Sequence, residues 1–239
     1  MEHKRIALVT GANKGIGLEI ARQLAEAGVT VIIGSRDAGR GQAAVAELAG
    51  QGLEATSVQL DVTDETSIAA AATTIGARDG RLDILVNNAG IFDFADAAPS
   101  SASIPAVRKV LETNFIGALA VTQGMLPLLR KSAAGRIVNL SSSLGSLSVN
   151  ADPSSPYFAQ RYIGYNASKA ALNMLTIQLT EELRDTGIVV NSVSPGFVKT
   201  DLTGYGFMTP EEGGRLPVRH ALGGVDNGRF IEPDGYTPW

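Results

Sequence analysis

The strongest constraint on the fold is the alternation of short apolar runs with longer helix-period segments along all 239 residues. The apolar runs are predicted as strands: Ile6–Thr10, Val29–Gly34, Ala55–Leu60, Leu82–Val86, Arg136–Leu140, Ile188–Val193 and Arg229–Ile231. Their apolar residues are mostly continuous, which is typical of strands buried on both faces. The alternation predicts one α/β domain over residues 1–239, a doubly wound parallel sheet of about seven strands with helices on both faces.

The segments between these strands have the 3.6-residue period of amphipathic helices. They are predicted to form helices over Gly15–Ala27, Ala38–Ala49, Asp64–Ala77, Val107–Lys131 and Tyr165–Asp185. Pro127 lies in the fourth of these helices and predicts a kink or break there. Residues 93–104, rich in Ala, Ser and Pro, are predicted as a loop, as are residues 143–161 and 203–210.

Composition excludes several classes of protein. Basic and acidic residues are interleaved and give a formal net charge of −4, which argues against a basic face for nucleic acid and against a polybasic membrane patch. Cysteine is absent and the histidines are His3 and His220, so disulfides, thiol nucleophiles and a metal site are not expected. The apolar stretch Ile6–Val9 is too short for a signal peptide and no stretch could span a bilayer, so the expected location is cytoplasmic.

A glycine-rich segment, Thr10–Gly17, joins the first predicted strand to the first helix. Gly11, Gly15 and Gly17 allow a tight turn and a close approach of the backbone to a pyrophosphate, while the helix N-terminus offers unpaired N–H groups to the anion. The spacing is Gly-x-x-x-Gly-x-Gly, not the more common Gly-x-Gly-x-x-Gly. At the first strand–helix junction of an alternating chain, this segment favours nucleotide binding over a glycine turn of purely structural origin.

The end of the second strand indicates which dinucleotide would bind. An NAD site usually has an acidic residue after this strand to hold the ribose 2′-hydroxyl, whereas here Ser35 takes that position and Arg36 follows. Arg36, Arg40 and Lys14 could converge on one anion, and the planar fork of arginine suits a phosphate. The pattern favours NADP(H), although Asp37 could still reach the ribose and both arginines could be ordinary surface charges.

Candidate catalytic groups occur in the second half of the chain. Tyr165 and Lys169 are four residues apart, so they lie one above the other on a helix face. A nearby ammonium is expected to lower the pKa of the phenol from about 10 toward the working range of an acid–base catalyst. Ser141–Ser143 follows the fifth strand and Asn87–Gly90 the fourth, at the sheet edge where ligands bind in such folds. A serine hydroxyl there could hold a substrate oxygen while the tyrosine protonates it.

Taken together and in order, these motifs resemble those of the short-chain dehydrogenases/reductases, a Rossmann-fold family, over essentially the whole chain. They are Thr10–Gly17, Asp61-Val62, Asn87–Gly90, Asn114, Ser142, Tyr165-x-x-x-Lys169 and Pro195-Gly196. Within the family the chain is similar to the NADPH-dependent carbonyl reductases, through Arg36-Asp37 with Arg40–Ala44, Thr209–Gly213, and Gly228–Phe230 with Trp239. The resemblance implies reduction of a small aldehyde or ketone to an alcohol by hydride transfer from NADPH.

The resemblance also assigns roles to single residues. Tyr165 would be the general acid, Lys169 its activator, and Ser142 the group that orients the carbonyl. Asn114, which on its own is most simply a solvent-facing or locally bonded side chain, would help to hold a water between Lys169 and solvent. The implied cofactor contacts are Gly11, Asn13, Lys14, Gly15, Ile16 and Gly17 in the glycine loop, Arg36 and Arg40 at the 2′-phosphate, Asp61 and Val62 at the adenine, Asn88, Ala89 and Gly90 with Tyr165 and Lys169 at the ribose, and Pro195, Gly196, Val198 and Thr200 at the nicotinamide carboxamide.

One segment departs from the family pattern. Ser142 and Tyr165 lie further apart than in the common short members, yet closer than in the monomeric carbonyl reductases, which have a large insertion here. The extra residues, 150–163, are expected to lie over the substrate pocket or along the helix through which many members dimerise. The sequence therefore leaves open whether the protein is a monomer or a homo-oligomer. The loops expected to line the substrate pocket are 92–104, 143–161 and 200–215.

Two other functions stay open at this point. A non-catalytic NADP(H)-binding redox sensor should lack one of the Ser, Tyr and Lys residues of the site, and this chain has all three. An NAD-dependent alcohol dehydrogenase of the same family would use Asp37 rather than Arg36 at the ribose. Enoyl reductases usually space the Tyr and Lys further apart, and sugar epimerases carry a larger C-terminal substrate domain; neither feature is present.

Overall fold

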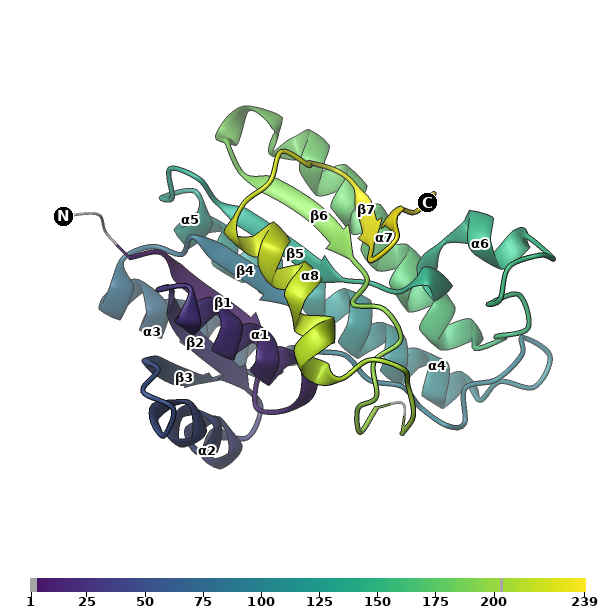
Figure 1. The fold of residues 1–239 in the computed structure, drawn as a ribbon, viewed down its shortest axis with the longest axis horizontal. Coiled ribbons are helices and arrows are strands. Elements are labelled where there is room, and N and C mark those ends of the chain that lie inside the picture. Colours follow the sequence, from purple (N-terminus) through teal and green to yellow (C-terminus); the bar gives the residue numbers. More distant parts are fainter. Residues whose placement is uncertain (1–3, 203) are drawn as a thin grey trace.

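A central twisted sheet with helices on both faces forms the protein in its computed structural model, which describes residues 4–202 and 204–239 (Figure 1). Within these residues eight strands follow the order β3-β2-β1-β4-β5-β6-β7-β8. They are β1 Ile6–Thr10, β2 Thr30–Ser35, β3 Ala55–Gln59, β4 Ile84–Asn87, β5 Arg136–Leu140, β6 Val189–Val193, β7 Phe230–Glu232 and β8 Gly235–Tyr236. The pairs from β3 through β7 are parallel, and β8 runs antiparallel to β7. The predicted doubly wound sheet is confirmed, with one short strand more than expected.

The strand order reverses beside β1, which pairs with β2 on one side and with β4 on the other. In a doubly wound sheet this reversal opens a crevice at the carboxyl ends of the strands, and ligands bind there. The glycine loop follows β1 and the Ser142 segment follows β5, so both lie at this edge of the sheet. The topology therefore brings the predicted phosphate-binding loop and the predicted catalytic groups to one side of the molecule.

Helices cover the two faces of the sheet in two separate layers. They are α1 Gly15–Glu26, α2 Ala38–Ala49, α3 Glu65–Asp79, α4 Ile104–Leu111, α5 Gly117–Leu129, α6 Leu147–Ala151, α7 Ile163–Glu182 and α8 Pro210–Leu222. Helices α3, α5 and α7 contribute to one apolar core and α1, α2 and α8 to the other. Among the described helices, none combines the length and the apolar composition that crossing a membrane requires.

The predicted helix over 107–131 is interrupted, but not at Pro127. Helix α4 is followed by one π-helical turn, Glu112–Ile116, and then by α5, which runs through Pro127 to Leu129. Proline has no N–H to donate to the carbonyl of Gln123, four residues earlier, and the helix ends two residues after Pro127. The chain therefore does not break at Pro127, and the irregular turn lies at Asn114, whose side chain is bonded outside the helix.

Helix α8 is the main element that the sequence did not predict. Residues 200–215 were expected to be a substrate loop, and from Pro210 onward this is wrong because α8 begins there. Two adjacent glycines and Pro217 hide its helical period in the sequence. A capping box stabilises its start, with Thr209 and Glu212 each bonding the other's backbone N–H. Thr203, within the predicted loop, lies outside the described residues.

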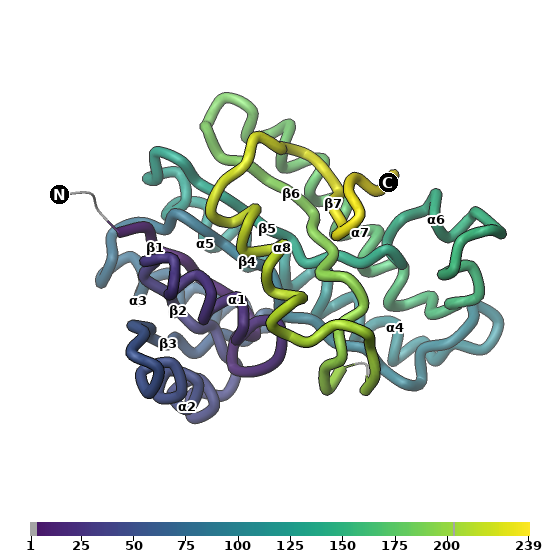
Figure 2. Tube along the Cα trace, in the orientation of Figure 1, coloured from purple at the N-terminus to yellow at the C-terminus, as the bar shows by residue number. Residues whose placement is uncertain are grey.

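The other two predicted substrate loops meet at the start of α7, at the right of the tube view in Figure 2. Segment 143–161 is not a plain loop, since it contains a 3₁₀ turn, Ser143–Gly145, and the short helix α6. The backbone N–H of Ile163 donates to the carbonyl of Ala97 at 3.1 Å. The loop after β4 is thus tied to the first turn of the helix that carries Tyr165 and Lys169.

Candidate active site

The glycine loop has the backbone shape that the sequence predicted. Gly11 and Gly15 have φ values of 63° and 58°, in the left-handed region that favours glycine. A Cβ on Gly17 would lie 2.4 Å from the Asn88 side chain, so this glycine is required for close packing against the end of β4. At Gly15, by contrast, a Cβ would meet only the Thr200 methyl group, at 4.0 Å. The space beside Gly15, at the N-terminus of α1, is therefore open to a ligand.

Asn88 and its neighbours hold this loop in place. The Asn88 amide donates to the carbonyl of Thr10 at 2.8 Å. The backbone N–H groups of Asn88 and Ala89 donate to the Thr10 hydroxyl at 3.0 and 2.9 Å. The sequence placed Asn88, Ala89 and Gly90 beside a ribose, and the structure shows that the Asn88 side chain binds the glycine loop itself. The two motifs form one unit because their strands are neighbours.

The end of β2 shows what Ser35 and Asp37 do. Ser35 is buried, and its hydroxyl donates to the carbonyl of Asp37 at 2.8 Å. The Asp37 carboxylate caps α2 by accepting the backbone N–H of Arg40 at 2.9 Å. A cleft of about 580 Å³ opens next to this turn, and Arg36, Val58 and Asp61 are among its lining residues. One oxygen of the carboxylate that could reach a ribose thus caps a helix N-terminus.

Lys14 does not join the two arginines in this structure. Its ammonium lies 2.8 Å from a carboxylate oxygen of Asp201, and both side chains are exposed. Asp201 follows Thr200 in the segment after β6, so this pair links the glycine loop to the loop that precedes α8. An exposed pair of this kind contributes little to stability and is easily displaced. Lys14 is therefore free to turn to another anion at small cost.

Tyr165, Lys169 and Ser142 come together at the carboxyl end of β5. Tyr165 lies in the first turn of α7, and the Lys169 ammonium is 5.6 Å from the centre of its ring. The Lys169 ammonium donates to the carbonyl of Leu140 at 2.7 Å. The hydroxyl of Ser142, two residues after Leu140, forms a hydrogen bond with the Tyr165 hydroxyl. The helix spacing of four residues and the strand end thus place all three groups at one point.

Burial sets the protonation of this cluster. It raises the pKa of Tyr165 to about 12, against the opposing effect of the hydrogen bond from Ser142. Burial also lowers the pKa of Lys169 to about 8, because an ammonium loses its hydration there. The expectation that the pKa of the phenol lies below its ordinary value is wrong in this structure, because desolvation is the largest effect on it. At neutral pH the tyrosine is a phenol and the lysine an ammonium.

Asn114 is buried and makes contacts that link two elements. Its side chain accepts the backbone N–H of Ile91 at 2.8 Å and donates to the carbonyl of the same residue at 2.9 Å. Its amide also donates to the Ser168 hydroxyl at 3.1 Å. The π turn thus places Asn114 in contact with both the segment after β4 and α7. Its partner in α7, Ser168, directly precedes Lys169.

Asp96 is a contact of the site that the sequence did not reveal. Its buried carboxylate accepts the backbone N–H groups of Gly164 at 2.9 Å and Tyr165 at 2.7 Å. It therefore caps α7 from a distant loop, which explains why this helix begins without a capping side chain of its own. Phe92, in the same loop, packs edge-on against the Tyr165 ring, with ring centres 5.7 Å apart. A cap from far along the chain leaves no local sequence signal.

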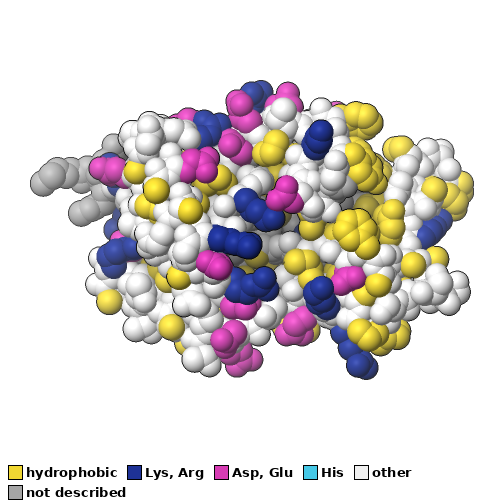
Figure 3. Space-filling view, turned by 90° about the horizontal axis from the view of Figure 1, so that it is seen from below, with side chains coloured by type: hydrophobic (Ala, Val, Ile, Leu, Met, Phe, Trp, Pro, Cys, Tyr) yellow, Lys and Arg dark blue, Asp and Glu magenta, His cyan; other side chains and the backbone are white. Residues whose placement is uncertain are grey.

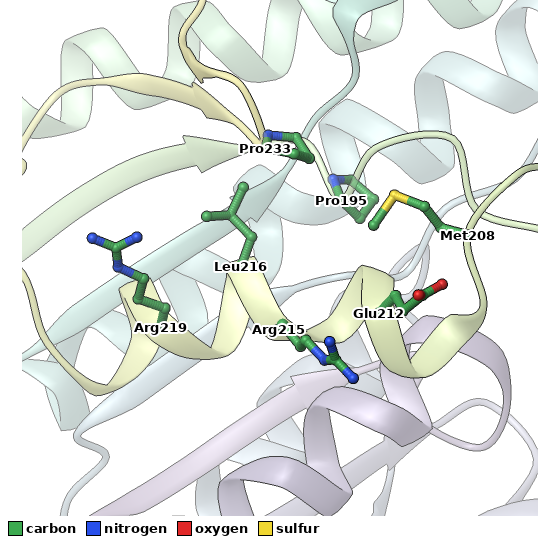
Figure 4. Close-up of a pocket in the computed structure, with 7 residues that line it drawn as sticks. All are labelled: Pro195, Met208, Glu212, Arg215, Leu216, Arg219 and Pro233. Atoms are coloured by element: carbon green, nitrogen blue, oxygen red, sulfur yellow. The ribbon is translucent and has the colours of Figure 1, made fainter.

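The segment after β6 contains the remaining predicted cofactor contacts, Pro195, Gly196, Val198 and Thr200. Gly196 has a φ of 86°, and a Cβ there would lie 2.6 Å from the Met208 sulfur. Val198 forms a β-bridge with Met208. Pro195 also lines a second cleft, of about 240 Å³, where Figure 4 shows Leu216 of α8 directed toward Pro233. Pro195 is the predicted cofactor-contact residue that lines this second cleft.

Comparison with known proteins decides the family. The model of the short chain dehydrogenase family matches residues 5–209. The chain belongs to the short-chain dehydrogenase/reductase family. A curated relative, short-chain dehydrogenase/reductase 1 of Saponaria officinalis, is 36% identical over 299 aligned positions, which cover 100% of this chain and 97% of the relative. Carbonyl reductase (NADPH) 1 of Macaca fascicularis is 33% identical and covers 98% of both chains.

Solved structures agree with this assignment. The crystal structure of NADPH-bound carbonyl reductase from chicken fatty liver is similar with a TM-score of 0.85 and 32% identity, over 99% of this chain and 100% of that one. The predicted family and fold are therefore confirmed. This short-chain dehydrogenase/reductase is an oxidoreductase by family membership.

Proposed function

We propose that this short-chain dehydrogenase/reductase reduces an aldehyde or ketone with NADPH and uses Tyr165 as the general acid. The observation that carries the proposal is the contact between the half-buried side chains of Tyr165 and Ser142, next to the buried Lys169 ammonium. With a pKa of about 12, Tyr165 holds its proton at neutral pH and can donate it. A reductase needs such a donor, because the carbonyl oxygen becomes an alkoxide when the carbon accepts a hydride.

The residues of the chain have separate parts in this reaction. NADPH, when bound, supplies the hydride. The Ser142 hydroxyl donates a hydrogen bond to the carbonyl oxygen and stabilises the charge that develops on it. The Tyr165 hydroxyl transfers its proton to that oxygen, and the positive charge of Lys169 stabilises the phenolate that is left. The balance is one hydride and one proton added to one carbonyl group, which gives an alcohol.

The cofactor-binding residues of this chain fit NADPH. The open space beside Gly15 at the start of α1 suits a pyrophosphate, since the helix N-terminus presents unpaired N–H groups. Arg36 lines the cleft beside β3, where a 2′-phosphate would face it. One carboxylate oxygen of Asp37 is already engaged as the cap of α2. Figure 3 shows several Lys and Arg side chains across the middle of one face, with Asp and Glu side chains among them.

Aromatic side chains on both sides of Ser142 favour an apolar substrate. Phe92 follows β4 and packs against Tyr165. Phe197 follows β6 and packs against Tyr205 and Phe207, with ring centres 5.3 and 5.5 Å apart. Because β4 and β6 are the two neighbours of β5, these clusters flank the end of the strand that precedes Ser142.

The test is NADPH oxidation by the purified protein with aldehydes, α-keto esters, diketones and quinones. With the best of these substrates, Tyr165→Phe is expected to lower turnover by about 10²-fold or more, the usual scale for a lost proton-transfer group. NADPH binding, followed by the fluorescence of the cofactor, is expected to stay at the parent value. Near-parent turnover in Tyr165→Phe would exclude the tyrosine as the acid, and no oxidation with the whole panel would favour a binding protein.

A further inference from the structure

Asn173 is a buried side chain of α7 to which the proposed reaction gives no part. It lies four residues after Lys169, so it is on the same face of the helix. Its side chain is 3% exposed, and both ends of its amide are bonded. The amide oxygen accepts the Ser141 hydroxyl at 2.7 Å, and the amide nitrogen donates to the carbonyl of Gly145 at 3.2 Å. These two partners stand on either side of Ser142 in the chain.

The turn that carries Ser142 lies directly on the backbone of α7. A Cβ on Gly145 would come within 2.7 Å of the carbonyl carbon and the Cβ of Lys169, so the turn and the helix touch without an intervening side chain. Within the turn, the Gly145 N–H donates to the carbonyl of Ser142 at 2.7 Å. Ser142 is therefore held from its two flanks, and the Asn173 amide connects both flanks to the helix of Tyr165.

We infer that Asn173 is a positioning residue that fixes the Ser142 turn against α7, so that the hydroxyls of Ser142 and Tyr165 meet at one substrate oxygen. The inference rests on the proposed function, since it acts through Ser142. The two hydroxyls belong to different elements, and their separation depends on the contacts between those elements. A displacement of about 1 Å at a reacting centre can lower the rate about a hundredfold.

The experiment is a double-mutant cycle between Asn173→Ala and Ser142→Ala, measured as the single-turnover rate of NADPH oxidation with the best substrate of the panel. Asn173→Ala alone is expected to lower this rate by about ten- to a hundredfold. In the Ser142→Ala background it is expected to lower the rate less than about threefold, because the group that it positions is gone. An equal factor in both backgrounds would overturn the inference and leave Asn173 as a purely structural residue.

Asn191, in the neighbouring strand β6, provides a matched control. It is also a buried asparagine with both amide ends bonded, to the carbonyl of Asp226 at 2.8 Å and to the N–H of Arg229 at 3.0 Å. Asn191→Ala is expected to lower the thermal midpoint much as Asn173→Ala does, while the single-turnover rate stays near the parent value. A loss of rate equal to that of Asn173→Ala would contradict the inference, because it would follow from loss of stability alone.

Ser141→Ala covers the case in which Asn173→Ala does not fold. It removes one of the two bonds of the amide and leaves the helix unchanged, so a loss of about three- to tenfold is expected, again only when Ser142 is present. A parent-like rate in Ser141→Ala would count against the inference. A parent-like rate in Ser142→Ala itself would refute the proposed function, and the inference with it. A strong loss in Ser142→Ala without coupling to Asn173 or Ser141 would refute the inference alone.

Discussion

Replacing Lys169 with Met is expected to change how the stability of the cofactor-free protein depends on pH. Burial lowers the pKa of Lys169 from 10.5 to about 8, and unfolding returns it to its ordinary value. Between these two values the unfolded chain binds more protons than the folded one, so the free energy of unfolding rises with pH in that range. Methionine has about the length of the lysine stem and carries no proton, so this rise is expected to disappear in Lys169→Met.

The size of the effect follows from the shift. The difference between 10.5 and about 8 corresponds to roughly 3 kcal/mol of unfavourable burial of the ammonium at neutral pH. Raising the pH from about 7 to about 9.5 relieves about 2 kcal/mol of this. The raised pKa of Tyr165, about 12, opposes this rise in the free energy of unfolding only when the pH approaches 10, the ordinary pKa of tyrosine. At neutral pH, Lys169→Met is expected to gain about 1 kcal/mol of stability rather than the full amount of roughly 3 kcal/mol, because the Leu140 carbonyl loses its donor.

The assay is urea unfolding followed by circular dichroism at about pH 7 and pH 9.5. The parent and a surface control, Lys131→Met, are expected to gain stability between the two conditions by about 2 kcal/mol more than Lys169→Met does. Other groups titrate alike in all three proteins and cancel in this difference. An equal pH dependence in the parent and in Lys169→Met would refute the reasoning, because Lys169 would then keep an ordinary pKa in the folded protein.

Three further predictions concern the cofactor, the helix cap and the insert. Arg36→Ala is expected to weaken NADPH binding about ten- to a hundredfold, since a hydrogen bond to a charged group contributes about 1.5–3 kcal/mol. NADH binding is expected to stay constant. A parent protein that prefers NADH in kcat/KM would contradict this prediction. Asp96→Ala is expected to lower both the thermal midpoint and turnover. The control Asp83→Ala removes another buried carboxylate that accepts a backbone N–H, and it is expected to lower the thermal midpoint alone. Equal turnover in the two variants would count against a role of the cap in the reaction. Replacing residues 151–161 with a short Gly/Ser connector is expected to alter substrate preference or mass in solution at constant NADPH affinity, and no change in either would show that the segment is a passive surface feature.

The sequence by itself determined those features that depend on neighbours along the chain. The continuous apolar runs predicted the strands of the sheet because burial on both faces leaves no room for alternating polar residues. Gly11 and Gly15 predicted a tight turn, and both adopt a left-handed conformation in which other residues are strained. Tyr165 and Lys169 were placed together by helical spacing alone. In each case the physical constraint acts within a few residues, and a linear pattern records it.

The tertiary structure decided what depends on residues far apart in the chain. Asp37 caps α2 in its own turn, but Asp96 reaches the start of α7 from a loop after β4, and Asn173 reaches the Ser142 turn from another element. The direction in which the Tyr165 pKa shifts from its ordinary value also depended on the fold. A nearby lysine predicts a lower pKa, whereas burial of the phenol raises it. Burial is a sum over the many atoms that surround a group in space, and no short stretch of sequence contains that sum.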